Sequence, residues 1–175
     1  MSKPTLSIVI PTYNEKDNIF RILERLKKVL KSITHEIIFV DDNSPDGTSA
    51  VIKDCIKNSS KIRLIHRIGR KGLAGSVIEG VFAANADLVA VMDCDLQHDE
   101  TKLLDMINLF SKNNSLDIVI GSRFTETGEI SEKAFSKMRE LGSKATTLII
   151  KKVLNIESTD PLSGFFMVKK ESFLK

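Results

Sequence analysis

LVAVMDCDLQH, at residues 88–98, joins a short apolar run to two aspartates that are one residue apart. The run Leu88–Met92 is typical of a buried strand, and Asp93 and Asp95 follow it directly. Similar apolar runs recur along the chain and alternate with segments of helical periodicity. The expected strands are residues 6–10, 36–40, 62–66, 88–92, 116–120 and 164–168. This alternation predicts an α/β fold, with a mostly parallel sheet flanked by helices on both faces.

The segments between the expected strands carry apolar residues at three- and four-residue steps, as amphipathic helices do. The first helix is expected from Asn18 to Ile33, with Asp17 or Asn18 as its cap. Further helices are expected at residues 48–58, from the glycine-rich segment 69–80 to about 86, and at 100–113. A long helix is expected at about 131–154, where six Lys or Arg residues stand against two Glu residues.

The chain's 175 residues correspond to one domain. Twenty-six basic and 23 acidic residues give a formal charge of +3, which is too weak to indicate a nucleic acid partner. Cys55 and Cys94 lie far apart without a metal-ligand pattern, so a reducing, cytosolic compartment is expected. No signal peptide and no run of about 20 apolar residues is present, so membrane association is expected either to be peripheral or to belong to sequence outside this chain.

Polar clusters follow the first, second and fourth expected strands, at residues 11–15, 41–46 and 93–98. Each could be ordinary strand-end chemistry, because Asp, Asn and Pro are favoured in turns. Gathering carboxylates at one sheet edge is unfavourable, however, since two unit charges about 4 Å apart repel by about 4 kcal/mol at an effective dielectric of about 20. A cation would relieve this repulsion. Asp93, Asp95 and Gln97 are hard oxygen ligands that suit Mg²⁺ or Mn²⁺.

A basic segment at residues 61–71 contains no acidic residue. It is either a solvated face or a ligand site in which Arg70 or Lys71, just before a helix start at Gly72, faces an anion. Arg123, after the fifth expected strand, is another candidate anion contact.

Several common sites are absent from the sequence. It has no G-x-x-x-x-G-K-[ST], G-x-G-x-x-G or G-x-S-x-G motif. His35 and His66 are expected to be structural, whereas His98 lies near the acidic residues. Cys94 sits between two aspartates that raise its pKa, so a reactive thiolate is not expected.

Together these stretches resemble family-2 glycosyltransferases of the GT-A fold, in the branch of dolichol-phosphate mannosyltransferases and polyprenyl-phosphate sugar transferases. The matching stretches are LSIVIPTYNEKDNI at 6–19, IIFVDDNSPDGT at 37–48, RKGLAGSVIEG at 70–80, VAVMDCDLQHDE at 89–100, GSRF at 121–124 and STDPLSGFFMVKKE at 158–171. The resemblance covers nearly the whole chain and implies a Rossmann-like, mostly parallel sheet. It also implies that residues 1–175 form a single GT-A domain lacking the family's C-terminal segment.

The resemblance implies a site for a nucleotide-sugar donor. The implied donor-binding residues are Pro11, Tyr13, Glu15, Val40, Asp42, Lys71, Asp93, Cys94, Asp95 and Arg123. Asp93, Asp95 and Gln97 would hold the Mg²⁺ or Mn²⁺, and Asp93, Asp95 and Arg123 would be the catalytic residues. The metal would neutralise charge on the leaving nucleoside diphosphate. The acceptor oxygen would then attack the anomeric carbon in one inverting step.

The implied donor is of the GDP-mannose or UDP-glucose type, and the implied acceptor is a polyprenyl phosphate. Such an enzyme is expected to be cytoplasmic and peripheral at the cytoplasmic membrane face. The basic helix at about 131–154 could pack on the sheet, but the resemblance favours contact with an anionic membrane surface.

Three alternatives stay open: a non-catalytic nucleotide-sugar-binding module, a family-2 enzyme with a different acceptor, and a phosphatase of the haloacid dehalogenase kind. The phosphatase places its D-x-D after the first strand, whereas here D-x-D follows the fourth.

Overall fold

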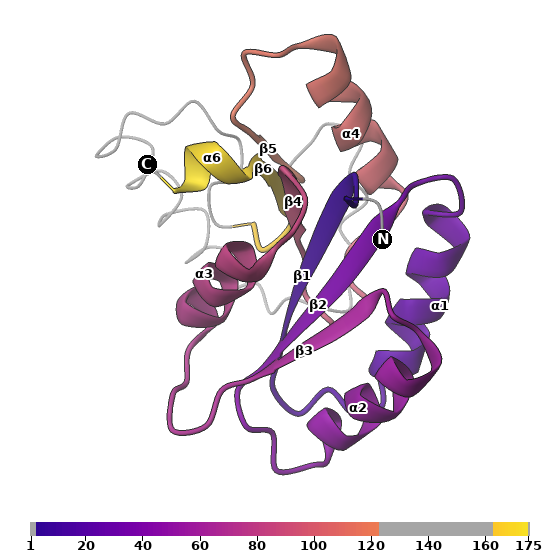
Figure 1. Ribbon diagram of the computed structural model, residues 1–175, viewed down its shortest axis with the longest axis vertical. Coiled ribbons are helices and arrows are strands. Elements are labelled where there is room, and N and C mark those ends of the chain that lie inside the picture. Colours follow the sequence, from indigo (N-terminus) through magenta and orange to yellow (C-terminus); the bar gives the residue numbers. More distant parts are fainter. Residues whose placement is uncertain (1–2, 123–162, 175) are drawn as a thin grey trace, which may run out of the picture. The chain divides into compact units, whose positions relative to one another are not determined.

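The computed structural model describes residues 3–122 and 163–174, which form a sheet of six strands in the order β3-β2-β1-β4-β6-β5 (Figure 1). The strands are β1 (Leu6–Thr12), β2 (His35–Asp41), β3 (Ile62–His66), β4 (Leu88–Val91), β5 (Ile118–Ile120) and β6 (Phe166–Lys169). The helices are α1 (Ile19–Val29), α2 (Thr48–Asn58), α3 (Leu73–Ala83), α4 (Lys102–Lys112) and α6 (Lys170–Phe173). The expected α/β fold with a mostly parallel sheet is confirmed.

The chain divides into two compact units, Met1–Val119 with Phe166–Lys175, and Ile120–Phe165. The first unit contains most of the described residues and all of the described helices. Both the helix expected at about 131–154 and Arg123 lie outside the described residues. No helix in the described ranges is long and apolar enough to cross a membrane.

β1 lies inside the sheet and pairs in parallel with β2 on one side and β4 on the other. Thr12 is in register with Asp41, and Val9 is in register with Val91. The carboxyl ends of these three strands therefore lie at the same edge of the sheet. β6 is the exception to the parallel pattern, because it runs antiparallel to β4.

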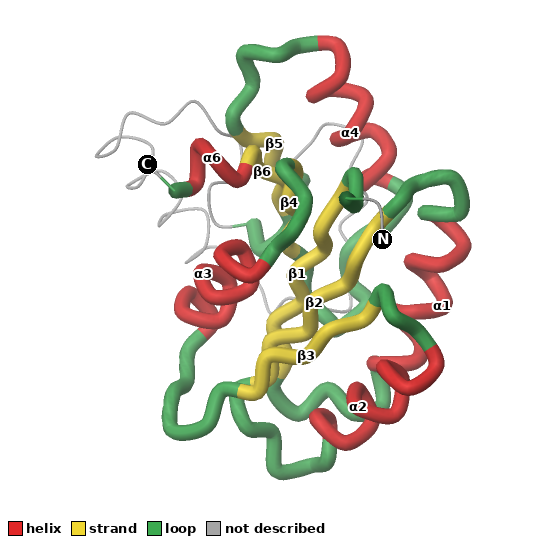
Figure 2. Tube along the Cα trace, viewed as in Figure 1, coloured by secondary structure: helices red, strands yellow, loops and turns green. Residues whose placement is uncertain are grey.

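The helices bury both faces of the sheet, with α1 and α2 on one side and α3 on the other (Figures 1 and 2). Val9 and Val40 pack with Val81 of α3 in one buried cluster, while alternate residues such as Ile8 point to the opposite face. α3 approaches β1 so closely at Gly80 that a Cβ there would overlap the Val9 side chain. This close packing explains why a glycine stands inside the helix.

Most elements end within a few residues of the sequence expectation, and β1 and α1 illustrate the differences. β1 continues through Pro11 to Thr12, because its ladder with β4 ends at Val9 and a strand tolerates a residue without an N–H where it has one neighbour. α1 ends at Val29, and Asn18 is its N-cap by position but makes no capping hydrogen bond with its side chain. Asn18 Nδ2 donates instead to Glu15 Oε2 at 2.7 Å.

A buried carboxylate, Glu36, ties β1, β2 and β3 together at the amino-terminal edge of the sheet. Its Oε1 accepts hydrogen bonds from Ser7 Oγ and the Asn85 N–H, both at 2.6 Å. Its Oε2 accepts from Arg63 and Asn85 Nδ2, both at 2.9 Å. Burial by itself would raise the pKa of Glu36, but the hydrogen bonds from Ser7, Asn85 and Arg63 together lower it below its ordinary value. This edge is therefore held by an ionised carboxylate.

Candidate active site

The polar clusters that follow β1 and β4 meet at the carboxyl edge of the sheet. β1 and β4 are parallel neighbours in the sheet, so the residues that follow them leave the same edge. Burial and the negative charges of Glu15, Asp95 and Asp93 raise the pKa of Cys94 to about 12. Glu15 comes from the first cluster and the two aspartates from the third, so the charges of both clusters act on one buried thiol. The predicted convergence of these clusters is thus present in the structure, and Cys94 is protonated at neutral pH.

Backbone-to-side-chain hydrogen bonds join the first cluster to the second cluster and to the start of α2. The Asn14 N–H donates to Ser44 Oγ at 2.9 Å, and the Glu15 N–H donates to Thr48 Oγ1 at 3.0 Å. Asn14 has φ +60°, a left-handed conformation that Asn adopts more readily than most residues. The turn that results leaves the Tyr13 side chain exposed, at 48%.

Asp41, the first aspartate of the pair that follows β2, has a structural role. Its side chain is fully buried and accepts hydrogen bonds from Thr12 Oγ1, from the N–H and Oγ of Ser44, and from Ser49 Oγ. These donors come from β1, from the loop after β2 and from α2. Asp41 therefore fixes the loop between β2 and α2.

Asp42, expected to bind the donor, is held from the other side by the segment that leads into α3. Its carboxylate accepts from the Arg67 guanidinium, from Ser76 Oγ at 2.8 Å and from the Gly72 N–H at 2.7 Å. Burial alone would raise the pKa of Asp42, but the hydrogen bonds from Gly72, Ser76 and Arg67 outweigh burial and lower it. Asp42 thus positions the N-terminus of α3 beside the acidic edge.

Residues 61–71 do not form a uniformly solvated basic face, because Arg67 is buried. Its side chain is only 5% exposed and pairs with both Asp42 and Glu79. The sequence pattern did not single out Arg67, and neither motif nor spacing distinguishes it from the exposed cations near it. The available signal was physical, because a carboxylate at a buried strand end needs a compensating charge.

Arg70 and Lys71, the two candidate anion contacts before α3, have partners within the chain. Arg70 forms an ion pair with Glu79 Oε1 at 3.0 Å. The Lys71 ammonium lies 5.0 Å from the centroid of the Tyr13 ring, within the range of a cation–π interaction. The structure thereby brings together two of the expected donor-binding residues. Pro11 and Val40, two others, are register partners at the ends of β1 and β2.

The loop after β4 presents Asp95 and Gln97 to solvent, whereas Cys94 is buried. The Gln97 N–H donates to Asp95 Oδ1 at 3.1 Å, and His98 Nε2 lies 3.1 Å from Asp93 Oδ2. The Asp93 side chain is 39% exposed. His98 therefore contacts one of the expected metal ligands, as its position in the sequence indicated.

These residues fit a divalent cation that is shared with a ligand. Within residues 3–122 and 163–174, no group of three or more His, Cys, Asp or Glu side chains is placed to hold a metal ion by itself. Mg²⁺ is usually bound by one or two carboxylates together with substrate phosphates and water. Asp93, Asp95 and the amide oxygen of Gln97 supply hard oxygen donors of that kind, with enough exposure to meet a diphosphate.

The fold is that of the GT-A glycosyltransferases. The mannosyltransferase PcManGT from Pyrobaculum calidifontis, solved with GDP-Man and Mn²⁺, matches with a TM-score of 0.65 at 16% identity over 98% of this chain and 46% of that one. Glucosyl-3-phosphoglycerate synthase from Mycobacterium tuberculosis, solved with Mn²⁺, UDP and phosphoglyceric acid, matches with a TM-score of 0.68 at 19% identity over 96% of this chain and 56% of that one. At these identities the likeness concerns the fold alone.

The chain belongs to glycosyl transferase family 2, whose sequence model matches residues 7–175. It is 36% identical over 170 residues to a dolichol-phosphate mannosyltransferase from Pyrococcus furiosus, and the aligned region covers 95% of this chain and 46% of the relative. It is 31% identical over 168 residues to a dolichol-phosphate mannosyltransferase from Saccharomyces cerevisiae, and the aligned region covers 94% of this chain and 61% of the relative. The chain thus spans about half the length of the curated relatives that it matches.

Proposed function

We propose that this chain forms the donor-binding and catalytic part of an enzyme that transfers mannose, or a similar hexose, from a nucleotide sugar to a polyprenyl phosphate with inversion. The observation that carries the proposal is the parallel register of β1, β2 and β4, which places Glu15, Asp42, Asp93 and Asp95 at one carboxyl edge of a GT-A sheet. The relatives named dolichol-phosphate mannosyltransferase support the choice of sugar and acceptor.

In this proposal the nucleoside lies against the ends of β1 and β2. The exposed Tyr13 ring offers a face on which a base can stack, a contact worth about 1–3 kcal/mol. Asp42 contacts the base or ribose while it holds Arg67, and Glu15 bounds the same space. Pro11 and Val40 form the strand ends beneath it. Lys71, already over Tyr13, brings a positive charge to this end of the donor.

Asp93, Asp95 and Gln97 hold a divalent ion, either Mg²⁺ or Mn²⁺, on the donor diphosphate. When bound, the ion neutralises charge that develops on the leaving nucleoside diphosphate. A phosphate monoester has a second pKa of about 6, so a polyprenyl phosphate is largely ionised at neutral pH and its oxygen needs no strong base. We assign Arg123, from the sequence, to the donor phosphates or the acceptor.

We infer that the whole protein works as a peripheral protein at the cytoplasmic face of a membrane, because a polyprenyl phosphate presents its phosphate there. Co-sedimentation of the chain with vesicles that contain anionic lipid tests this inference. Binding at low salt that weakens as salt is raised supports the inference, whereas no binding at low salt contradicts it.

Donor binding is tested by thermal shift and calorimetry with GDP and UDP, each in Mn²⁺ and in EDTA. Ligand at 100 times its Kd stabilises a native state by about 2.7 kcal/mol, so a productive pair gives a clear shift. Asp95→Asn is expected to abolish the Mn²⁺-dependent part of nucleotide binding. Asp99→Asn is the matched control, because Asp99 is exposed in the same loop and the Oδ1 of an asparagine can still accept hydrogen bonds from the N–H and Oγ1 of Thr101. Equal binding in EDTA and Mn²⁺ would contradict the metal role.

Turnover separates an enzyme from a non-catalytic binding module. The assay supplies a nucleotide hexose with a polyprenyl phosphate in detergent, and it follows the hexose into the lipid fraction. Donor binding without transfer, in a chain that includes the segment present in longer relatives, would favour the module.

A further inference from the structure

The loop at residues 93–100, called the acidic loop below, makes a bend that needs outside support. Leu96, at its centre, has φ +66°. A leucine rarely adopts this left-handed conformation, which persists only where the surrounding structure holds it. Asp95 and Gln97, two of the proposed metal ligands, flank Leu96, so the bend determines where their side chains point.

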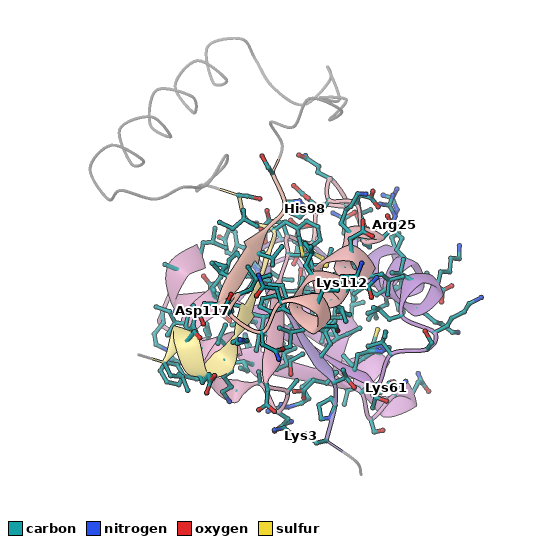
Figure 3. All side chains as sticks on the ribbon, turned by 90° about the horizontal axis from the view of Figure 1, so that it is seen from above. Lys3, Arg25, Lys61, His98, Lys112 and Asp117 are labelled. Carbon is teal, nitrogen blue, oxygen red and sulfur yellow. The ribbon has the colours of Figure 1, made fainter. Side chains whose placement is uncertain are left out.

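Arg25 of α1 supplies that support. A single guanidinium nitrogen, Nη1, donates to the Leu96 carbonyl oxygen at 3.3 Å and to Glu100 Oε1 at 3.1 Å. Glu100 is buried, with 6% of its surface exposed, and forms an ion pair with Arg25. Figure 3 labels Arg25 and, in the acidic loop, His98. Arg25 therefore fastens both the bend and the end of the acidic loop to a helix that precedes it by about 70 residues.

We propose that Arg25 is a positioning residue for the metal–diphosphate site, acting through Leu96 on Asp95 and Gln97. The inference rests on the proposed function and extends it to a residue that lies outside every matched motif. Its basis is that Arg25 of α1 holds the bend at Leu96. The Gln97 N–H donates to Asp95 Oδ1 within the same bend, so the position of the bend affects both residues. Partners that orient metal ligands from outside typically change metal affinity about 10–100-fold when they are removed.

The proposal is tested by measuring Mn²⁺ affinity in the presence of GDP by calorimetry. Arg25→Ala is expected to weaken Mn²⁺ binding at least tenfold, and Arg25→Lys less, because a lysine ammonium can reach one of the two acceptors. Arg21→Ala is the matched control, since Arg21 is exposed one turn earlier on α1. GDP binding in EDTA, which depends on the nucleoside contacts alone, is expected to be unchanged in all three variants.

Arg25→Ala leaves the buried Glu100 without its cation and could unfold the acidic loop for that reason alone. The double variant Arg25→Ala with Glu100→Gln removes the unpaired charge while the Leu96 carbonyl stays without its donor. A wild-type unfolding midpoint together with weakened Mn²⁺ binding in this double variant supports positioning. Wild-type Mn²⁺ affinity in the double variant overturns the inference and leaves the proposed function standing. Absence of Mn²⁺-dependent binding of both GDP and UDP in the unchanged chain overturns both.

Discussion

Glu36→Gln is expected to destabilise the fold by about 3 kcal/mol at neutral pH. Whichever way the new amide is turned, its NH₂ replaces an oxygen that accepts two hydrogen bonds in the structure. A typical hydrogen bond contributes about 1 kcal/mol and one to a charged group about 1.5–3 kcal/mol. Arg63 can turn to water, because its side chain is 40% exposed, so the sum lies toward the lower end.

The measurement is urea unfolding followed by circular dichroism. For a chain with a slope of about 2 kcal/mol per molar urea, the expected loss moves the midpoint down by about 1.5 M. Glu24→Gln is the control, because Glu24 is exposed on α1 and loses no buried partner. It is expected to leave the midpoint within the range of an ordinary surface substitution, about 0.5 kcal/mol.

The pH dependence distinguishes the charge from the shape of the side chain. The pKa of Glu36 is lowered in the folded state, so its contribution is fully present above the unfolded-state pKa, near 4.5, and is lost as the pH falls through the folded pKa. The stability difference between the wild type and Glu36→Gln should therefore shrink below about pH 4.5. An unchanged midpoint at pH 7, or a difference that persists undiminished in acid, would refute the reasoning.

Three further predictions follow from packing and contacts. Gly80→Ala should destabilise the fold by about 1–3 kcal/mol in urea unfolding, because the new methyl overlaps Val9; a neutral result would mean that α3 moves freely on the sheet. Cys55 and Cys94 are buried, so a thiol reagent in native buffer should modify them only as fast as the chain unfolds; rapid modification would show that the surrounding loops open. Asp42→Ala should weaken GDP binding in calorimetry and leave inorganic pyrophosphate binding nearly unchanged; equal weakening of both would argue against a base or ribose contact.

The inner strands of the sheet were predictable from sequence because β1, β2 and β4 are buried on both faces. Apolar runs without alternation mark such strands, and the expected strand at residues 6–10 forms the buried body of β1. The shared edge of the polar clusters followed from parallel topology, which places the carboxyl ends of neighbouring strands together. The sequence pattern therefore predicts which strands are buried and that these neighbouring strands run in parallel, and the structure agrees on both points.

The sequence did not predict which side chains pair with each other. Asp41 and Asp42 are adjacent in sequence, yet one fixes the loop to α2 and the other holds the segment that leads into α3. Arg67 and Arg70 are three residues apart, yet Arg67 is buried and Arg70 is largely exposed. Composition records the charge of each residue and not the direction in which a loop turns it. The role of Arg25 could not be predicted for the same reason, since Arg25 meets Leu96 and Glu100 only when α1 packs beside the acidic loop.

The place of β6 between β4 and β5 has a consequence for the nascent protein on the ribosome. β4 ends at Val91 and its antiparallel partner begins at Phe166, so about 75 residues must be synthesised between them. At about 5–20 residues per second, translation leaves the outer edge of β4 unpaired for about 4–15 s. An open edge presents unpaired backbone groups on which another strand can dock. Translational pausing between these positions is therefore expected to prolong the interval in which the emerging chain needs a chaperone.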